Sequence, residues 1–224
     1  MSKSTSPSRP KKTASPFRTP EQRAKERQKK RDALLLAAAR AFNAKGFFAA
    51  SLDDVAASLG VTKPVIYHYL GNKEQVLFEC LQKGMVTLFE AAEKAKAQNG
   101  RAIERLRAFL RAYALSNMTD FGRCIVLTTE EMLSAESAAR FRKLKREIDS
   151  ALRDLVQSCI DEGTLETSHP KFAAFAFVGA LSWPARWYQH DGQQSPKAIA
   201  DALVEVVLGG TLSASERERL KAAR

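Results

Sequence analysis

The chain has 224 residues, 45% hydrophobic and 27% charged, a balance that indicates a globular protein with a real core. There is no N-terminal apolar stretch of the kind that marks a secretory signal. The longest apolar run, residues 172–183, falls short of the roughly 20 residues that a membrane-spanning helix needs. We therefore interpret that run as a helix buried on several sides, and we expect a cytoplasmic protein without membrane contact.

The net charge of +11 is unevenly placed. Residues 1–31 contain eleven Lys and Arg against two acids, which leaves 25 basic and 23 acidic residues in the remainder. Residues 1–18 are almost free of apolar side chains, so we expect a disordered basic arm. A cationic arm on a nearly neutral body favours a polyanionic partner. A solvated tail without a dedicated partner explains the arm equally well.

The first ordered segment is predicted to be a helix from Thr19 to about Lys45. Thr19 is suited to the N-cap, Pro20 to the first helical position, and Gln22 to the reciprocal capping contact. Two short helices follow. Ser51 is expected to cap the first, with Asp54 three residues on.

The second short helix is expected over residues 63–70, after a turn at Gly60 and a cap at Thr62. Asn72 and Gln75 form the capping pattern of a longer helix that ends before residues 99–100. Apolar residues at helical spacing continue through residues 103–113, 120–133 and 134–162. A very apolar helix over about 170–190, kinked at Pro184, precedes a last helix over about 196–210 and a polar C-terminal tail at 213–224.

No strand-period alternation of useful length occurs, so we predict an all-α fold. We divide it into a helix-turn-helix domain at residues 19–72, with its motif at about 51–70, and a larger helical domain at residues 73–212. The three cysteines, Cys80, Cys124 and Cys159, lack metal-ligand spacing and are expected to be buried free thiols of a reducing compartment.

The segment 51–73, SLDDVAASLGVTKPVIYHYLGNK, matches the plan of a helix-turn-helix, whose second helix enters the major groove of DNA. Ala56 lets the two helices approach, Gly60 allows the sharp turn, and Val61 and Ile66 close the core between them. The side chains that this leaves facing outward are Thr62, Lys63, Pro64, Val65, Tyr67 and His68.

This outward set is suited to duplex DNA. Lys63 can donate to a guanine edge or a phosphate, and Pro64 and Val65 can contact thymine methyl groups. Lys73 is positioned for a phosphate at a helix N-terminus, and residues 25–31 would add salt-sensitive attraction. The alternative is an ordinary helical hairpin with partly buried surface aromatics.

Residues 28–90 resemble the DNA-binding domain of the TetR/AcrR family, most specifically in Tyr67-His68-Tyr69 and Asn72-Lys73-Glu74. Leu70 departs from the family, which more often has Phe there. The resemblance implies a homodimer on a palindromic operator, with one set of residues facing bases and another contacting or supporting the backbone. The base-facing set is Lys63, Pro64, Val65 and His68, and the backbone set is Ser51, Thr62, Tyr67, Tyr69 and Lys73.

The resemblance also implies that the last two long helices form the dimer interface, although the same residues could be plain monomer core. The expected interface residues are Phe172, Phe175, Gly179, Trp183, Ile199, Leu203 and Val206. Residues 179–210 are similar to TetR-type regulators of lipid and sterol catabolism, which implies a fatty acid or acyl-CoA effector. The expected pocket residues are Leu110, Tyr113, Met118, Arg123 and Met132, with Arg142 and Arg186 as further cations.

Two other classes compete with a ligand-released repressor. An enzyme is disfavoured, because His68, His169 and His190 are dispersed and the chain has no nucleophile triad, HExxH or phosphate-binding glycine loop. We expect no catalytic residues, no metal and no cofactor. An effector-independent DNA-binding or scaffold protein with the same fold remains open.

Overall fold

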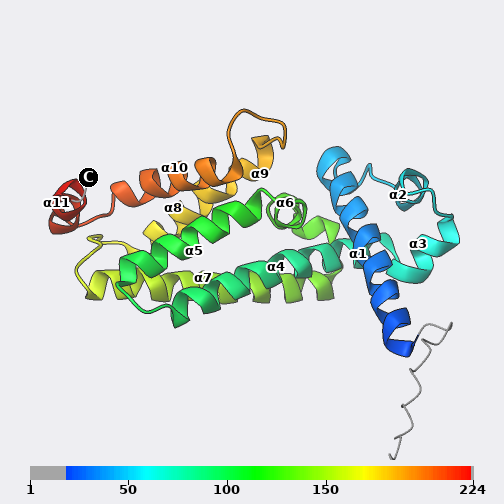
Figure 1. The fold of residues 1–224 in the computed structure, drawn as a ribbon, viewed down its shortest axis with the longest axis horizontal. Coiled ribbons are helices and arrows are strands. Elements are labelled where there is room, and N and C mark those ends of the chain that lie inside the picture. Colours follow the sequence, from blue (N-terminus) through cyan, green and yellow to red (C-terminus); the bar gives the residue numbers. More distant parts are fainter. Residues whose placement is uncertain (1–18, 223–224) are drawn as a thin grey trace, which may run out of the picture.

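The computed structural model describes residues 19–222, and over that range it contains helices and one isolated backbone bridge between Leu165 and Leu212. Figure 1 shows a small group of three helices at one end of an elongated helical body. The predicted all-α fold, with an N-terminal helix-turn-helix domain and a larger C-terminal helical domain, is confirmed. The basic arm at residues 1–18 lies outside the described residues.

The N-terminal domain consists of α1 (Pro20–Lys45), α2 (Leu52–Ser58) and α3 (Lys63–Leu70). The predicted capping box of α1 is confirmed, since Thr19 accepts from the backbone N–H of Gln22 and the Gln22 side chain accepts from that of Thr19. The C-terminal half of α1 carries the core face of this domain, which is Leu34, Leu35, Ala38, Ala39 and Phe42.

The body begins with α4 (Lys73–Ala97), whose predicted capping box of Asn72 and Gln75 is confirmed. The remaining helices of the body are α5 (Ala102–Asn117), α6 (Asp120–Leu127), the 3-10 turn η1 (Glu130–Met132), α7 (Ala135–Asp161), α8 (Pro170–Ser182), α9 (Pro184–Trp187), α10 (Pro196–Gly209) and α11 (Ala214–Ala222). Helix α5 runs through the middle of the bundle and packs against α4, α7, α8 and α10. Its apolar face, including Leu106 and Phe109, is therefore fully buried.

Helix α6 connects the body to the N-terminal domain. A side chain at Gly84 of α4 would come within 2.8 Å of the Phe121 carbonyl, so glycine allows α4 and α6 to pack closely. On its other side α6 contacts α1, because Asn43 Nδ2 donates to the Asp120 carbonyl at 2.8 Å and Arg40 pairs with the Asp120 carboxylate at 3.0 Å. Helix α6 is thus in direct contact with both α4 of the body and α1 of the N-terminal domain.

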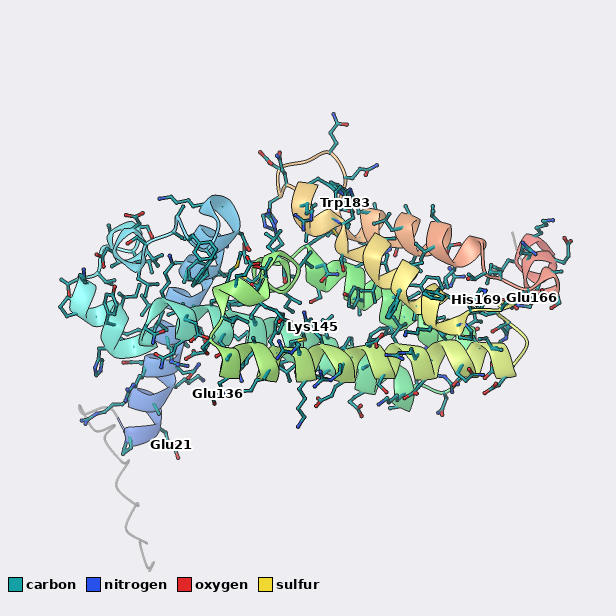
Figure 2. The ribbon with its side chains drawn as sticks, turned by 180° about the vertical axis from the view of Figure 1, so that it is seen from behind. Glu21, Glu136, Lys145, Glu166, His169 and Trp183 are labelled. Carbon is teal, nitrogen blue, oxygen red and sulfur yellow. The ribbon has the colours of Figure 1, made fainter. Side chains whose placement is uncertain are left out.

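The C-terminal segment differs from the predicted polar tail. Residues 214–222 form α11, and Glu216 is buried with Arg101 and Arg219 against its carboxylate. The loop before α8 lies at the same end of the body, where Glu166 donates its backbone N–H to the Thr211 carbonyl at 2.9 Å (Figure 2). Most side chains of α11 face solvent and only a narrow side packs against the body, which explains why the sequence of this segment is polar.

Pro184 interrupts the apolar C-terminal segment more sharply than the predicted kink. Helix α8 ends at Ser182, and the short α9 starts anew at Pro184, which cannot supply a backbone N–H to continue the ladder. The prediction that this segment is buried on several sides is wrong within one subunit. Phe172, Trp183 and Trp187 are 64%, 61% and 46% exposed, respectively.

Candidate DNA-binding site

The turn between α2 and α3 has the geometry that the sequence predicts. Gly60 has a φ of +64°, which L side chains rarely adopt, so the tight turn requires glycine here. The backbone N–H of Val61 donates to the Ala56 carbonyl at 3.0 Å, and Ala56 and Ile66 are buried between the helices. Helix α3 therefore rests on α2 and α1 through one face and leaves its other face outward.

Helix α3 lies at the extreme end of the molecule, away from the body (Figure 1). Lys63, Pro64 and His68 are exposed, and Tyr67 is 44% exposed. Thr62 is exposed as well, whereas Val65 and Tyr69 are half-buried. Three of the four predicted base-facing side chains, Lys63, Pro64 and His68, are thus exposed on α3, and Val65 is partly covered.

Ser51 and Thr62 are the N-cap residues of α2 and α3, as predicted, but only Ser51 caps through its side chain. Thr62 is the N-cap residue of α3 by backbone geometry, but its side chain makes no capping hydrogen bond, so its hydroxyl is available to another acceptor. Ser51 accepts from the backbone N–H of Asp53 at 3.1 Å and forms no reciprocal pair with Asp54. The Asp54 carboxylate instead pairs with Lys45 of α1 at 3.0 Å.

Lys63 has a partner that the sequence analysis missed. Its Nζ lies 2.7 Å from Oδ2 of Asp53, on α2, and 5.9 Å from the centre of the Tyr67 ring. The hydrogen bond and the charge of Asp53 raise the pKa of Lys63 above its ordinary value. Asp53 and Lys63 are ten residues apart, so their spacing does not predict a contact. The turn at Gly60 brings the N-terminus of α3 next to the N-terminus of α2 and so creates the pair.

Lys73 and Arg31 both brace the region around α3. Lys73 Nζ donates to the Phe48 carbonyl at 3.1 Å, which ties the start of α4 to the loop before α2. Arg31 Nε donates to the Tyr69 carbonyl at 3.1 Å, and its guanidinium also pairs with Glu79 of α4. Arg31 therefore holds α1 against α3 and α4. The sequence predicted only that residues 25–31 attract DNA phosphates in general.

The body contains a cavity of about 220 Å³ between α4, α5, α6, α7 and α8. Its walls are largely apolar, and Lys145 and Asp149 of α7 contribute the charged groups. The Tyr113 hydroxyl, which lies 3.2 Å from Ser182 Oγ, supplies a neutral polar group. Burial raises the pKa of Tyr113, so this hydroxyl stays protonated at neutral pH.

Among the five predicted pocket residues, only Tyr113 lines this cavity. Leu110 and Met118 are buried in the core and line neither this cavity nor the one that Met132 lines. Met132 lines a second cavity of about 270 Å³ beneath the N-terminal domain. Arg123 Nε donates to the Ala185 carbonyl at 2.9 Å and so holds α9 against α6.

The further cations of the sequence prediction also lie elsewhere. Arg142 pairs with Glu130 at 2.6 Å, and the Arg186 guanidinium lies 5.9 Å from the Trp183 ring. Lys145, labelled in Figure 2, is the cation that borders the 220 Å³ cavity. Within residues 19–222 no group of three or more His, Cys, Asp or Glu side chains is arranged to hold a metal ion.

A second outward surface follows α8 and α10. Phe172 and Phe175 are exposed on α8, Trp183 is exposed directly after it, and Val206 on α10 is 74% exposed (Figure 2 labels Trp183). A side chain at Gly179 would meet no other atom within 4 Å, so packing within the subunit does not require glycine there.

Two of the predicted interface residues point elsewhere. Ile199 is buried in the core of its own subunit, which contradicts its placement in an interface. Leu203 is half-buried and packs against that same core. Ile199, Leu203 and Val206 follow one side of α10, since they are spaced by four and three residues, and exposure along that side increases from the buried Ile199 to the exposed Val206.

The chain matches two family descriptions: "Bacterial regulatory proteins, tetR family" over residues 34–80, and "Tetracyclin repressor-like, C-terminal domain" over residues 99–211. A transcriptional activator, FasR of Mycolicibacterium smegmatis, is 25% identical over 186 residues, 82% of this chain and 84% of that protein. A transcriptional repressor, KstR2 of Mycobacterium tuberculosis, is 23% identical over 185 residues, 81% of this chain and 92% of that protein.

Solved structures agree with this likeness. PfmR, a TetR family regulator from Thermus thermophilus, superposes with a TM-score of 0.70 and 29% identity, covering 79% of this chain and 97% of that one. AibR in complex with isovaleryl coenzyme A and operator DNA gives a TM-score of 0.68 and 28% identity, covering 79% and 96%.

A buried helix-turn-helix core with an exposed second helix, set on an all-helical body, defines a DNA-binding transcriptional regulator of the helix-turn-helix class. The matches extend over both the N-terminal and the C-terminal domain. The chain belongs to the TetR family. Within residues 19–222 no helix is long and apolar enough to cross a membrane.

Proposed function

We propose that the protein is a homodimeric repressor that binds a palindromic operator through α3 and releases it when an apolar ligand occupies the body. The observation that carries the DNA-binding half is the exposed face of α3, which carries Lys63 and His68 on a helix at the far end of the molecule (Figure 1). In the proposed arrangement the exposed Lys63, Pro64 and His68 face the bases, and so does the uncovered part of the half-buried Val65. The backbone is contacted or supported by Ser51, Thr62, Tyr67, Tyr69 and Lys73.

The proposal of a dimer rests on the surface of α8 and α10. Exposed aromatic side chains at positions 172, 175 and 183 flank Gly179, where no atom of the same subunit approaches. A contiguous apolar surface of this kind marks an interaction site, and small residues within it let another helix approach closely. A second copy related by a two-fold axis would cover the surface and place the two α3 helices on one face of DNA, about 34–36 Å apart.

The effector half of the proposal rests on the 220 Å³ cavity. Its volume is below the roughly 300–1,000 Å³ of pockets for drug-sized ligands, so it suits a short acyl group better than a four-ring sterol. The Tyr113 hydroxyl can donate to a carbonyl oxygen, and Lys145 can pair with an anionic group at the opening. A fatty acid or the acyl part of an acyl-CoA has this chemistry. The neighbour AibR was solved with isovaleryl coenzyme A and operator DNA together.

Two contacts support coupling between the cavity and α3. Ile125 of α6 lines the cavity, and α6 holds α1 through Asp120. Helix α7 also lines the cavity, and its N-terminus is fixed to α4, since Ser134 donates its N–H and its hydroxyl to Glu74, each at 3.2 Å. A ligand that shifts α6 or α7 would change the separation of the two α3 helices and weaken DNA binding by linkage.

The DNA-binding half is tested by selecting duplexes from a random library with the full chain and measuring affinity by fluorescence anisotropy. Lys63→Ala and His68→Ala should lose about 10-fold or more against the selected duplex, since one good base contact is worth about 1–3 kcal/mol. Lys94→Ala, an exposed change at the far end of α4, is the matched control and should bind as the parent does. Failure to enrich any duplex would contradict the proposal.

The effector half is tested separately by thermal unfolding with fatty acids and acyl-CoAs of increasing chain length. A ligand at about 100 times its Kd should stabilise the folded protein by about 2.7 kcal/mol and lower its affinity for the selected duplex. If DNA binding holds while no such compound stabilises the protein, the effector-independent regulator replaces the ligand-released one.

A further inference from the structure

The pair of Asp53 and Lys63 has no evident role in holding the fold. Their charged atoms are 2.7 Å apart, yet the side chains are 46% and 63% exposed. Water screens an exposed pair strongly, so such pairs contribute little to stability. The backbone N–H of Asp53 already serves Ser51, and α2 and α3 are joined by the buried Ala56 and Ile66. The carboxylate also lies in the first turn of α2, where the helix dipole favours it, but that position does not explain its contact with Lys63.

Asp53 brings a negative charge to the surface that is proposed to meet a polyanion. Its neighbour Asp54 directs its carboxylate to Lys45 of α1, so the two acids of this turn serve different surfaces. An amine on arbitrary DNA gains mainly from phosphates and from the release of their counterions. A phosphate competes with Asp53 for the ammonium group of Lys63, and where Lys63 moves to the phosphate, Asp53 faces the DNA without a partner.

A guanine edge differs from a phosphate as a replacement for the Asp53 contact of Lys63. Its O6 and N7 are two acceptors at fixed positions in the major groove, whereas a phosphate contact is the same at every step of the duplex. An acceptor pair in the right place can compensate for the lost contact with Asp53, and a misplaced one cannot. The ion pair therefore reduces what Lys63 contributes to the affinity for arbitrary DNA more than what it contributes to the affinity for the operator.

We propose that Asp53 is a specificity-determining residue that acts through Lys63: it holds the ammonium group on arbitrary DNA and releases it where the operator presents a base acceptor. The inference rests on the proposed position of α3 in the major groove. It assigns Asp53 a positioning role, with no base contact of its own.

The test compares Asp53→Asn with Asp54→Asn, two changes that remove one carboxylate and one exposed ion pair from the same turn. Binding is measured by anisotropy against a mixed-sequence duplex and the selected duplex over a salt series. Asp53→Asn should strengthen binding to the mixed duplex by about fivefold or more near 0.1 M salt, and should steepen the salt dependence by about one ion per subunit. Its affinity for the selected duplex should change by less than about threefold, and Asp54→Asn should leave the ratio of the two affinities near that of the parent.

The same comparison in a Lys63→Met background separates an effect through Lys63 from general repulsion. Without the amine, Asp53→Asn should alter mixed-duplex binding by less than about twofold. An equal gain with and without Lys63, or no gain at all, overturns the inference while leaving the DNA-binding function intact. If the parent protein binds neither duplex, the proposed function itself fails. Thermal unfolding of each variant near the parental temperature verifies the fold.

Discussion

Replacing Gly179 with leucine should have opposite effects on the subunit and on the dimer. Gly179 lies within α8, between the exposed Phe175 and Trp183, and a side chain added there would meet no atom of the same subunit within 4 Å. Leucine is a better helix former than glycine by roughly 0.5–1 kcal/mol. The isolated subunit should therefore gain about that much stability.

The proposed dimer should lose stability from the same change. A side chain inserted into a packed contact costs about 1–3 kcal/mol, and a two-fold interface receives the insertion twice. The total of about 2–6 kcal/mol corresponds to a roughly 30-fold to 20,000-fold weaker dimer, because each 1.4 kcal/mol is a factor of ten. Operator affinity should fall with it, since each subunit alone contacts one half-site.

Sedimentation velocity over a concentration series gives the dimer Kd, and urea unfolding of the monomeric variant gives the subunit stability. Ser150→Leu, on the exposed side of α7, is the matched control and should leave the dimer unchanged. A Gly179→Leu protein that dimerises like the parent would refute the proposed interface. A less stable subunit would refute the claim that Gly179 is free of contacts within its own chain.

Three further changes test other parts of the structure. Arg101 and Arg219 lower the pKa of Glu216 from about 4.5 to about 2, so the stability from this carboxylate is fully present above about pH 4.5 and is lost as pH falls through about 2. Glu216→Gln should cost about 2 kcal/mol at neutral pH and flatten the acid limb in urea unfolding, and an unchanged acid limb would count against the pairing. Val178→Trp should place an indole ring in the 220 Å³ cavity and reduce ligand-induced thermal stabilisation, whereas a full ligand response would place the effector elsewhere. Ile66→Ala should cost about 2–4 kcal/mol in urea unfolding, and a loss below about 1 kcal/mol would contradict its place in the helix-turn-helix core.

The helix boundaries were predictable because their signals are local. Thr19 with Gln22 and Asn72 with Gln75 reach each other within one turn of a helix, so sequence spacing alone determines the contact. The outward face of α3 was predictable for the same reason, since the position of Ile66 fixes which side chains turn away.

The cavity and the ion pairs depend on distant parts of the chain. Leu110 and Tyr113 look alike in an apolar pattern, and only the packing of five helices decides which one borders a cavity. The pairing of Arg101 with Glu216 joins residues far apart in sequence, which is why 213–224 was expected to be a polar tail. The contact between Asp53 and Lys63 was not predicted, because it depends on the path of the turn at Gly60, which sequence spacing does not determine.

Site-directed cleavage of DNA tests the position of α3 most directly. The native Cys80, Cys124 and Cys159 are buried, so a chelated iron reagent should attach selectively to an introduced Thr62→Cys, at the exposed start of α3. We predict two clusters of cuts on the selected duplex, centred about 34–36 Å apart, and none from the same reagent at Lys96→Cys. Uncut DNA in a complex that still forms, or equal cutting from both positions, would contradict the claim that α3 lies in the major groove.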